Sequence, residues 1–379
     1  MILPLVSLGL FLLGQIGRLS FNQQEVNVYL YEIPYFIWIV HSLFKQRTKL
    51  KLPKAAISLI GILLATFLFG IFSVSAYENA VSLMYLVRLS LYLVGFSLTI
   101  QHFLKKTISP IYLNVFFSLV GVIGVIQYFF YNNLRNLQYL GWDPHLSRVF
   151  GQFLDTSVAG AVYGLTLVFI LFNQKLFPRA MKVLYAISYI LLGFFTYSRG
   201  FFVSLFISTI CYSLAIRRNL KAVLVVLALV VLFVVFSPKP FGEGVNLLRT
   251  STIKSRTTDY EQGFKLWQKN PIIGVGYNRI RYFKEDPISL TTVSELRGAS
   301  KNHAGASFHS SYLIILVTTG VFGFGAFVYW LWTVGKMSNF AMISMIFLGT
   351  YSLFDNILLH PFILFFWPVL IGVTSRSER

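Results

Sequence analysis

Charged residues are scarce in this chain, and acidic residues are the scarcest. Only 12% of its 379 residues are charged, whereas a soluble domain has roughly 25%. Hydrophobic residues make up 56%, among them 38 Phe and 21 Tyr. So much apolar surface cannot be buried inside a water-soluble globule, so lipid must be the solvent of this protein. The composition excludes a soluble domain and predicts a polytopic membrane protein.

Cysteine, metal-binding clusters and nucleotide-binding motifs are also missing. Cys211 is the only cysteine and lies in an apolar run, which excludes an internal disulfide and indicates a small apolar filler. The sequence has no phosphate-loop motif, no Cys/His cluster and no H-E-x-x-H. No D-x-D pair occurs in a predicted outer loop, and metal-assisted transfer needs carboxylates to hold its ion. We therefore expect chemistry without a metal or a cofactor.

Twelve apolar segments predict twelve transmembrane helices and an all-α fold. The first, MILPLVSLGLFLLGQIG, has no basic n-region and no A-x-A site, so we interpret it as a retained span rather than a signal peptide. Several segments are shorter than the about 20 residues of an untilted span. The segments cover about residues 1–17, 28–44, 55–74, 81–101, 110–131, 156–173, 183–197, 201–216, 222–236, 309–333, 338–354 and 361–374.

Basic residues alternate between the predicted loops, and this alternation indicates the topology. Because positive charge marks the cytoplasmic side, both termini are predicted to be cytoplasmic. The net charge of +19 is then a topology signal rather than a sign of nucleic-acid binding. The basic loops carry Lys45, Arg47, Lys49, Lys51, Lys54, Lys105, Lys106, Lys175, Arg179, Lys182, Arg217, Arg218, Lys221, Lys336, Arg376 and Arg379, whereas the short loops of the other parity carry only Arg18, Arg135, Arg148 and Arg199.

One long loop, residues 237–308, is predicted to face outward as a subdomain of a single membrane domain, residues 1–379. No repeat of fixed period and no low-complexity linker divides the chain. The loop holds eleven basic and six acidic residues, an excess that suggests an anionic ligand or lipid headgroups. The alternative is a solvated basic loop. The basic residues are Lys239, Arg249, Lys254, Arg256, Lys265, Lys269, Arg279, Arg281, Lys284, Arg297 and Lys301; the acids are Glu243, Asp259, Glu261, Glu285, Asp286 and Glu295.

This loop is predicted to contain an amphipathic helix. Thr258 and Glu261 have the spacing of a capping box that would open the helix, and Pro271 would close it. Tyr260, Phe264 and Trp267 would form its apolar face. Arg256 would precede the helix N-terminus, an arrangement that suits a phosphate. The alternative for Arg256 is a structural salt bridge.

Two arginines lie within or beside the predicted spans. Arg199 occupies the short outer turn Tyr197–Gly200, on the side where topology needs no positive charge, and this favours a functional role. Arg88 lies inside the fourth span, where a cation is costly. It could line a substrate cavity, or it could pair with Glu32 or Glu78.

His309 stands at the head of the tenth predicted span. Histidine titrates near neutral pH and can accept a proton from a sugar hydroxyl. An ordinary hydrogen-bonded histidine is the alternative, and the neighbouring His303 is a second candidate for the role.

Several of these pieces, in order, resemble the signatures of the bacterial O-antigen ligase and O-antigen polymerase superfamily. His309-Ser310, nine residues and then Gly320-Val321-Phe322-Gly323 is similar to an H-[NSQ]-x9-G-x-x-G signature. Ser198-Arg199-Gly200 resembles the SRG element, and Arg256 followed by Pro271-Ile272-Ile273-Gly274-Val275-Gly276 resembles the outer helix with its PllGvG end. Arg148-Val149-Phe150-Gly151-Gln152-Phe153 is similar to a weaker R-x-x-G-x-F element. Tyr260 departs from this pattern, because many members have Trp there.

The resemblance implies an enzyme of the bacterial inner membrane with its site on the outer face. The donor would be an undecaprenyl-diphosphate-linked glycan, and the acceptor a hydroxyl of lipid A–core or of another glycan. Arg199 and Arg256 would hold the diphosphate, and His309 would orient or deprotonate the acceptor hydroxyl. Further candidates for substrate binding are Arg88, Arg148, Tyr260 and Arg279.

Ligase and polymerase both fit this resemblance, and the histidine signature favours a ligase. A transporter of lipid-linked sugars, which is not an enzyme, is the rival from another class. A transporter would be expected to show two comparable halves. Here the only large loop lies late in the chain, without a counterpart in the first half. The sequence therefore favours the metal-independent glycosyltransferase, with membrane lipids as further partners and no nucleic acid.

Overall fold

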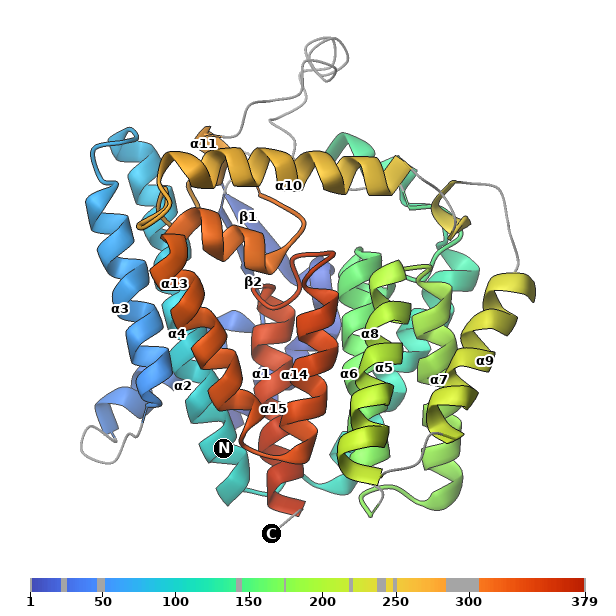
Figure 1. Ribbon diagram of the computed structural model, residues 1–379. Coiled ribbons are helices and arrows are strands. Elements are labelled where there is room, and N and C mark those ends of the chain that lie inside the picture. The colour runs from blue at the N-terminus through green and yellow to red at the C-terminus, as the bar shows by residue number, and fades with distance from the viewer. Residues whose placement is uncertain are drawn as a thin grey trace.

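The protein is a bundle of helices with one helix lying across its end (Figure 1). The computed structural model describes residues 2–21, 26–45, 52–140, 145–173, 175–217, 221–236, 243–247, 251–283 and 307–377. The helices before the long loop are α1 (Ile2–Leu10), α2 (Glu32–Lys45), α3 (Lys54–Phe69), α4 (Ala76–Lys105), α5 (Pro110–Phe130), α6 (Thr156–Phe172), α7 (Arg179–Phe195), α8 (Arg199–Tyr212) and α9 (Lys221–Phe236).

The rest of the bundle comes from the C-terminal third of the chain. Its helices are α10 (Ser251–Lys269), α11 (Ile280–Phe283), α13 (Ser311–Gly335), α14 (Asn339–Tyr351) and α15 (Pro361–Ser377). Short helical turns are η1 (Phe11–Gly17), η2 (Arg135–Leu140), η3 (Gly151–Phe153), η4 (Ser213–Arg217) and η5 (Glu243–Val245). The prediction of an all-α fold is confirmed, with one small addition. A hairpin of β1 (Arg18–Phe21) and β2 (Val26–Tyr29) pairs Arg18 with Tyr29 in antiparallel register.

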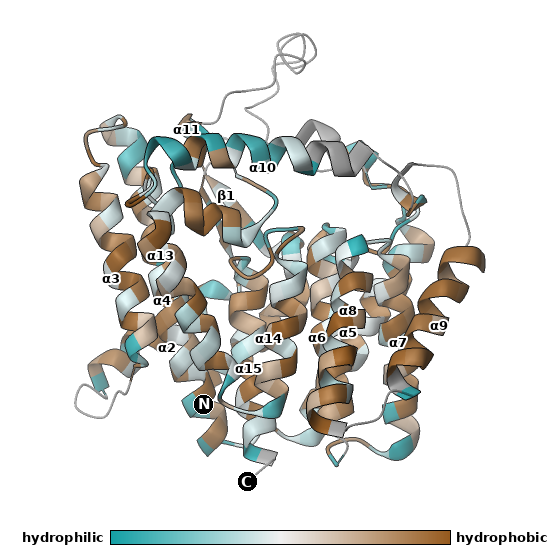
Figure 2. Ribbon diagram, viewed as in Figure 1, coloured by the Kyte–Doolittle hydropathy of each residue, from teal (hydrophilic) through white to brown (hydrophobic). Residues whose placement is uncertain are grey.

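The described helices have the length and composition of membrane-spanning segments to different degrees. Four are long and apolar enough to cross a bilayer: α4, α5, α8 extended to Ile216, and α13. Each of the twelve apolar segments of the sequence overlaps a helix, but the others are shorter. The bundle helices are mostly hydrophobic and α10 is mostly hydrophilic (Figure 2). The protein is therefore a multi-pass membrane protein, and twelve as the number of crossings stays a prediction.

Aromatic side chains fill the core around α15. Phe362, Phe366 and Trp367 of this helix are at most 1% exposed, and the helix packs along α4. Phe11, from the turn after α1, contacts the rings of Phe362 and Phe366 at centroid distances of 5.5 and 5.3 Å. Rings packed edge to face and stacked in this way each contribute about 0.5–1.5 kcal/mol beyond their buried area. The core thereby fixes the start of α15, and with it the loop before that helix.

A break in α13 receives the segment that follows α10. Gly320 has a φ of 65°, and a Cβ on it would lie 2.1 Å from the carbonyl oxygen of Ile272. The freed backbone groups are bonded instead by the segment 271–276: Val321 N donates to Pro271 O at 3.0 Å, and Gly276 N donates to Thr318 O at 2.9 Å. Broken helices are tolerated in a membrane domain when other backbone satisfies their polar groups. The two glycine motifs of the sequence therefore meet each other.

The start of α10 differs from the prediction. The helix begins at Ser251, so Thr258 lies inside it, and the expected capping box at Thr258 and Glu261 is wrong. Arg256 is accordingly a residue of the second turn and does not precede the helix N-terminus. The apolar spacing of residues 260–267 showed which face is apolar, but such a pattern does not mark where a polar helix begins. The predicted end before Pro271 is confirmed, because the helix ends at Lys269.

Candidate functional site

The loop between α14 and α15, residues 352–360, forms the centre of the site and is held rigidly against the start of α13. Ser352 O accepts hydrogen bonds from Ser310 Oγ at 3.0 Å and from Ser311 N at 3.2 Å. Ser311 Oγ donates to Asn356 Oδ1 at 3.0 Å and accepts from Leu358 N at 3.1 Å. All of these hydrogen bonds join the loop to the start of α13, so they fix the position of the loop relative to that helix.

Asp355 stands in this loop and pairs with Arg256 of α10. Arg256 Nη2 lies 3.0 Å from Asp355 Oδ2, and the two side chains are 20% and 14% exposed. Ser157 Oγ, at the start of α6, donates to the same oxygen at 2.9 Å. Burial raises the pKa of Asp355, and the Arg256 guanidinium opposes that rise. The structural salt bridge considered for Arg256 thus exists, and one partner of it belongs to the loop.

His309 pairs with Asp259, one helical turn after Arg256 on α10. Its Nδ1 hydrogen-bonds to Asp259 Oδ2, and its backbone N donates to the same oxygen at 3.3 Å. A carboxylate accepts only, so the shared proton is on Nδ1, and in the neutral ring Nε2 is left as the acceptor. The bond to Asp259 raises the pKa of His309, although burial opposes it. The side chain of His309 is 46% exposed, so a substrate can reach the ring.

Two further arginines approach the same loop from the other half of the bundle. Arg199 is the first residue of α8 and lies close enough to Arg256 for their charges to repel. Arg148 is 6% exposed, donates from Nε to Thr196 O at 2.8 Å, and acts electrostatically on Asp355. Three guanidiniums therefore share a region with the carboxylates of Asp259 and Asp355.

Tyr260 connects α10 directly to the central loop. Its hydroxyl donates to Leu353 O at 2.7 Å. The face of α10 that is buried against the bundle holds Asp259, Gly263 and Leu266, at the spacing of successive helical turns. Phe264 is 44% exposed, so only part of the predicted apolar face is covered.

The structure separates two of the predicted residues from this cluster. Arg88 forms a bidentate pair with Glu32, at 2.8 Å from Nε to Oε1 and 2.9 Å from Nη2 to Oε2, while Glu78 caps α4 through Ser75. Of the two acids considered as partners of Arg88, the structure selects Glu32. Arg279 is fully buried and donates from Nη2 to Phe67 O at 3.1 Å and to Asn79 Oδ1 at 2.5 Å. It fastens the outer segment to α3 and α4.

Some site residues were not singled out from the sequence. Asp355 was missed, and Asp259 was noted only as one acid of the loop. One signal was available for Asp355: it is an acid in a short predicted outer loop of a chain with 13 acids in all. His303, the alternative to His309, lies outside the described residues. Within the described ranges no three His, Cys, Asp or Glu side chains gather as a metal site, and chemistry without a metal stays a prediction.

One known family matches the part of the chain that carries much of this cluster. Residues 184–328 match the family described as O-antigen ligase, from α7 through most of α13. The matched region includes Arg199, Arg256, Asp259 and His309. No match was found among curated proteins. Over these residues the chain is similar to the O-antigen ligase family, which confirms the resemblance in the sequence and supports a ligase- or polymerase-type enzyme in general.

Proposed function

We propose that this protein is a membrane glycosyltransferase that moves a glycan from undecaprenyl diphosphate to an acceptor hydroxyl, with lipid A–core as the acceptor. The observation that carries the proposal is the meeting of Arg199, Arg256 and His309 around one rigid loop. These residues are 110 positions apart along the chain at their extremes, yet their charges act on one another. Polymerisation of repeat units by the same chemistry is the alternative within the superfamily.

The arginines suit the departure of a diphosphate. In the proposed step the acceptor oxygen bonds to the anomeric carbon, the bond from that carbon to the diphosphate oxygen breaks, and the diphosphate leaves with the electron pair. Negative charge then increases on the leaving group, and guanidiniums held in place stabilise it. The planar guanidinium binds phosphate through two parallel bonds, which explains arginine rather than lysine at positions 199 and 256.

His309 is placed to receive the proton of the acceptor hydroxyl. Asp259 holds the proton on Nδ1, so the lone pair of Nε2 is available for the hydroxyl proton, and the imidazolium that forms is stabilised by the carboxylate. Asp259 acts here as a positioning residue. Asp355 has the same relation to Arg256, because it fixes the guanidinium without consuming the other two arginines.

A complementation experiment tests the assignment. In a deletion strain we expect Arg256→Ala and His309→Ala to abolish surface glycan while membrane abundance stays normal, since Asp355 can take up a proton when its partner is removed. Lys265→Ala, on the exposed face of α10, is the matched control and should restore glycan fully. Normal glycan in both site variants would remove this assignment.

The glycan gel of the deletion strain separates ligase from polymerase. Loss of a ligase leaves long chains on the lipid carrier and a bare core. Loss of a polymerase leaves a core that carries one repeat. The first pattern is expected here.

The proposed site faces the periplasm, and both termini lie in the cytoplasm. In Figure 1 the two chain ends lie at the end of the bundle opposite α10. With Cys211→Ser as the background, a cysteine introduced by Lys265→Cys should react with a membrane-impermeant maleimide once the outer membrane is permeabilised. A cysteine introduced by Lys336→Cys should react only after the inner membrane is broken, and the reverse order would contradict the topology.

A further inference from the structure

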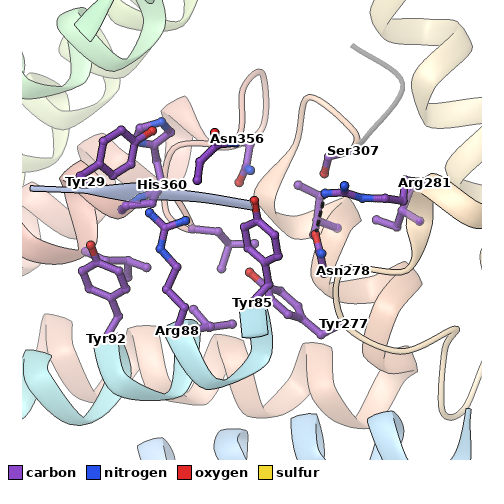
Figure 3. Close-up of a pocket in the computed structure, with 17 residues that line it drawn as sticks. Tyr29, Tyr85, Arg88, Tyr92, Tyr277, Asn278, Arg281, Ser307, Asn356 and His360 are labelled. Carbon is purple, nitrogen blue, oxygen red and sulfur yellow. Dashed lines mark hydrogen bonds between the residues drawn. The ribbon is translucent and has the colours of Figure 1, made fainter. Parts of the chain in front are cut away.

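A polar cavity borders the central loop, which lines it with Asn356, Leu359 and His360 (Figure 3). Its volume is about 370 Å³, within the roughly 300–1,000 Å³ of small-molecule sites. Four tyrosines line it, from β2, α4 and the segment before α11, together with two arginines and several amide side chains: Tyr29, Tyr85, Tyr92, Tyr277, Arg88 and Arg281 are the main ones. Such a lining is unsuited to a lipid tail.

The cavity and the Arg256–His309 cluster are built from the same two segments. The central loop gives Asp355 to the cluster and the next residue, Asn356, to the cavity. The head of α13 gives His309 to the cluster and Ser307 to the cavity. The cavity therefore adjoins the segment that carries His309. The arginines proposed to hold the diphosphate come from α8 and α10, and neither helix lines the cavity.

The two arginines of the cavity differ in their charge balance. Arg88 is neutralised by Glu32, which is fully buried. Burial lowers the pKa of His360, at the same end of the cavity, to about 3, so this histidine is neutral. Arg281, at the opposite end, contacts Asn278 Oδ1 at 3.4 Å and the Tyr85 ring at 5.8 Å. Among the described residues no carboxylate pairs with Arg281.

Two donors at this end of the cavity lack an acceptor. Arg281 Nε and Asn278 Nδ2 are buried and, within the part of the chain that the structure describes, have no hydrogen-bond partner. Buried donors without a partner are rare and costly, so this end of the cavity is incompletely satisfied. An acidic group in the cavity would balance the charge of Arg281, which lines it. Tyrosine rings at the other end can pack on a pyranose face, and their hydroxyls can bond its hydroxyl groups.

We propose that this cavity binds the terminal sugar of the acceptor, and that this sugar carries a carboxylate or phosphate held by Arg281. The assignment of this sugar to the acceptor rests on the proposed function. Neither Arg199 nor Arg256, the arginines proposed to hold the diphosphate, lines the cavity, whereas Ser307, two residues before His309, does. It is therefore the acceptor, rather than the donor diphosphate, that the cavity suits.

Saturation-transfer NMR on the full-length protein in detergent tests the binding. The probes are glucuronic acid, glucose 6-phosphate and glucose. We expect at least one acidic probe to bind at least tenfold more tightly than glucose, and Arg281→Gln to remove that preference. Arg281→Lys, which keeps the charge, should retain part of it, and unchanged melting temperatures exclude misfolding as the cause. The acidic probe that binds more tightly shows whether the group held by Arg281 is a carboxylate or a phosphate. Equal binding of all three probes, or a preference that survives Arg281→Gln, would overturn the proposal.

A transfer assay with the same variants separates this inference from the proposed function. Arg281→Gln should raise the acceptor KM at least tenfold with a smaller change in kcat, whereas Arg256→Ala should lose transfer and keep probe binding. An acceptor KM unaffected by Arg281→Gln would overturn the acceptor assignment alone. A wild-type protein that binds the acidic probe but transfers no glycan would overturn the proposed function and, with it, the identity of the sugar as an acceptor.

Discussion

The two halves of the segment 251–283 join the bundle in contrasting ways. The first half, on α10, makes charged side-chain contacts through Arg256 and Asp259, and both residues are reached by groups from distant helices. The second half makes backbone contacts, as glycines at 274 and 276 bring the chain against the break at Gly320. The difference teaches that one motif of the sequence supplies side chains to the proposed reaction centre, whereas the other holds the segment in position. The sequence pattern alone would not distinguish them.

The largest effect is expected from the scaffold half. Gly320→Ala would place a Cβ 2.1 Å from the carbonyl oxygen of Ile272 at a positive φ, and the backbone cannot yield there without loss of the hydrogen bonds around it. We expect little folded protein in the membrane, measured by detergent-extracted yield and melting temperature. Gly325→Ala, in the same helix and with no neighbour within 4 Å, should behave as wild type. Equal yields of the two variants would contradict the scaffold role.

A smaller effect, on rate rather than folding, is expected from the charged half. Asp259→Asn replaces the charged acceptor on His309 Nδ1 with a neutral amide, so the pKa of His309 should fall. Transfer requires neutral His309 and decreases as the pH falls through its pKa, so the acidic limb of kcat/KM should move to lower pH in the variant. We also expect the plateau rate to fall about 10–10²-fold, because the tautomer is no longer fixed. Thr258→Ala, next to it on the exposed face, is the control. An acidic limb that stays in place would argue against His309 as the base.

The smallest effect is expected from a substitution of Arg279, which tests whether this residue serves position alone. This arginine belongs to the scaffold half, and Arg279→Met should destabilise the protein by about 1–3 kcal/mol through loss of its buried hydrogen bonds. The transfer rate per folded molecule should change less than about twofold, which corresponds to only a small change in activation free energy. Thermal melting and transfer by the same preparation give both numbers. A large rise in KM with an unchanged melting temperature would instead return Arg279 to the substrate-binding residues.

Apolar periodicity and composition were sufficient to predict the helices, because burial in lipid or core dictates where apolar runs lie. They could not place the start of α10, because the residues of this helix are hydrophilic on average and its first turn carries no apolar signal. Likewise Arg199, Arg256 and His309 were found through their residue types and motifs. Asp355 was not, because its partner is 99 positions away and only the packing of α14 and α15 brings the two together. The sequence also left open whether Arg88 pairs with Glu32 or Glu78, and only the structure shows the bidentate pair with Glu32.

The break at Gly320 also determines the order in which the site can be assembled. During synthesis the segment 271–276 emerges before α13, so the bonds that Val275 N and Gly276 N make to Val317 O and Thr318 O form only once those residues arrive. Asp355 follows later still, and α15 holds the loop that carries it. The proposed reaction centre is thus complete only when the last helix has formed, and a chain that stalls before residue 355 would hold Arg256 without the carboxylate that orients it.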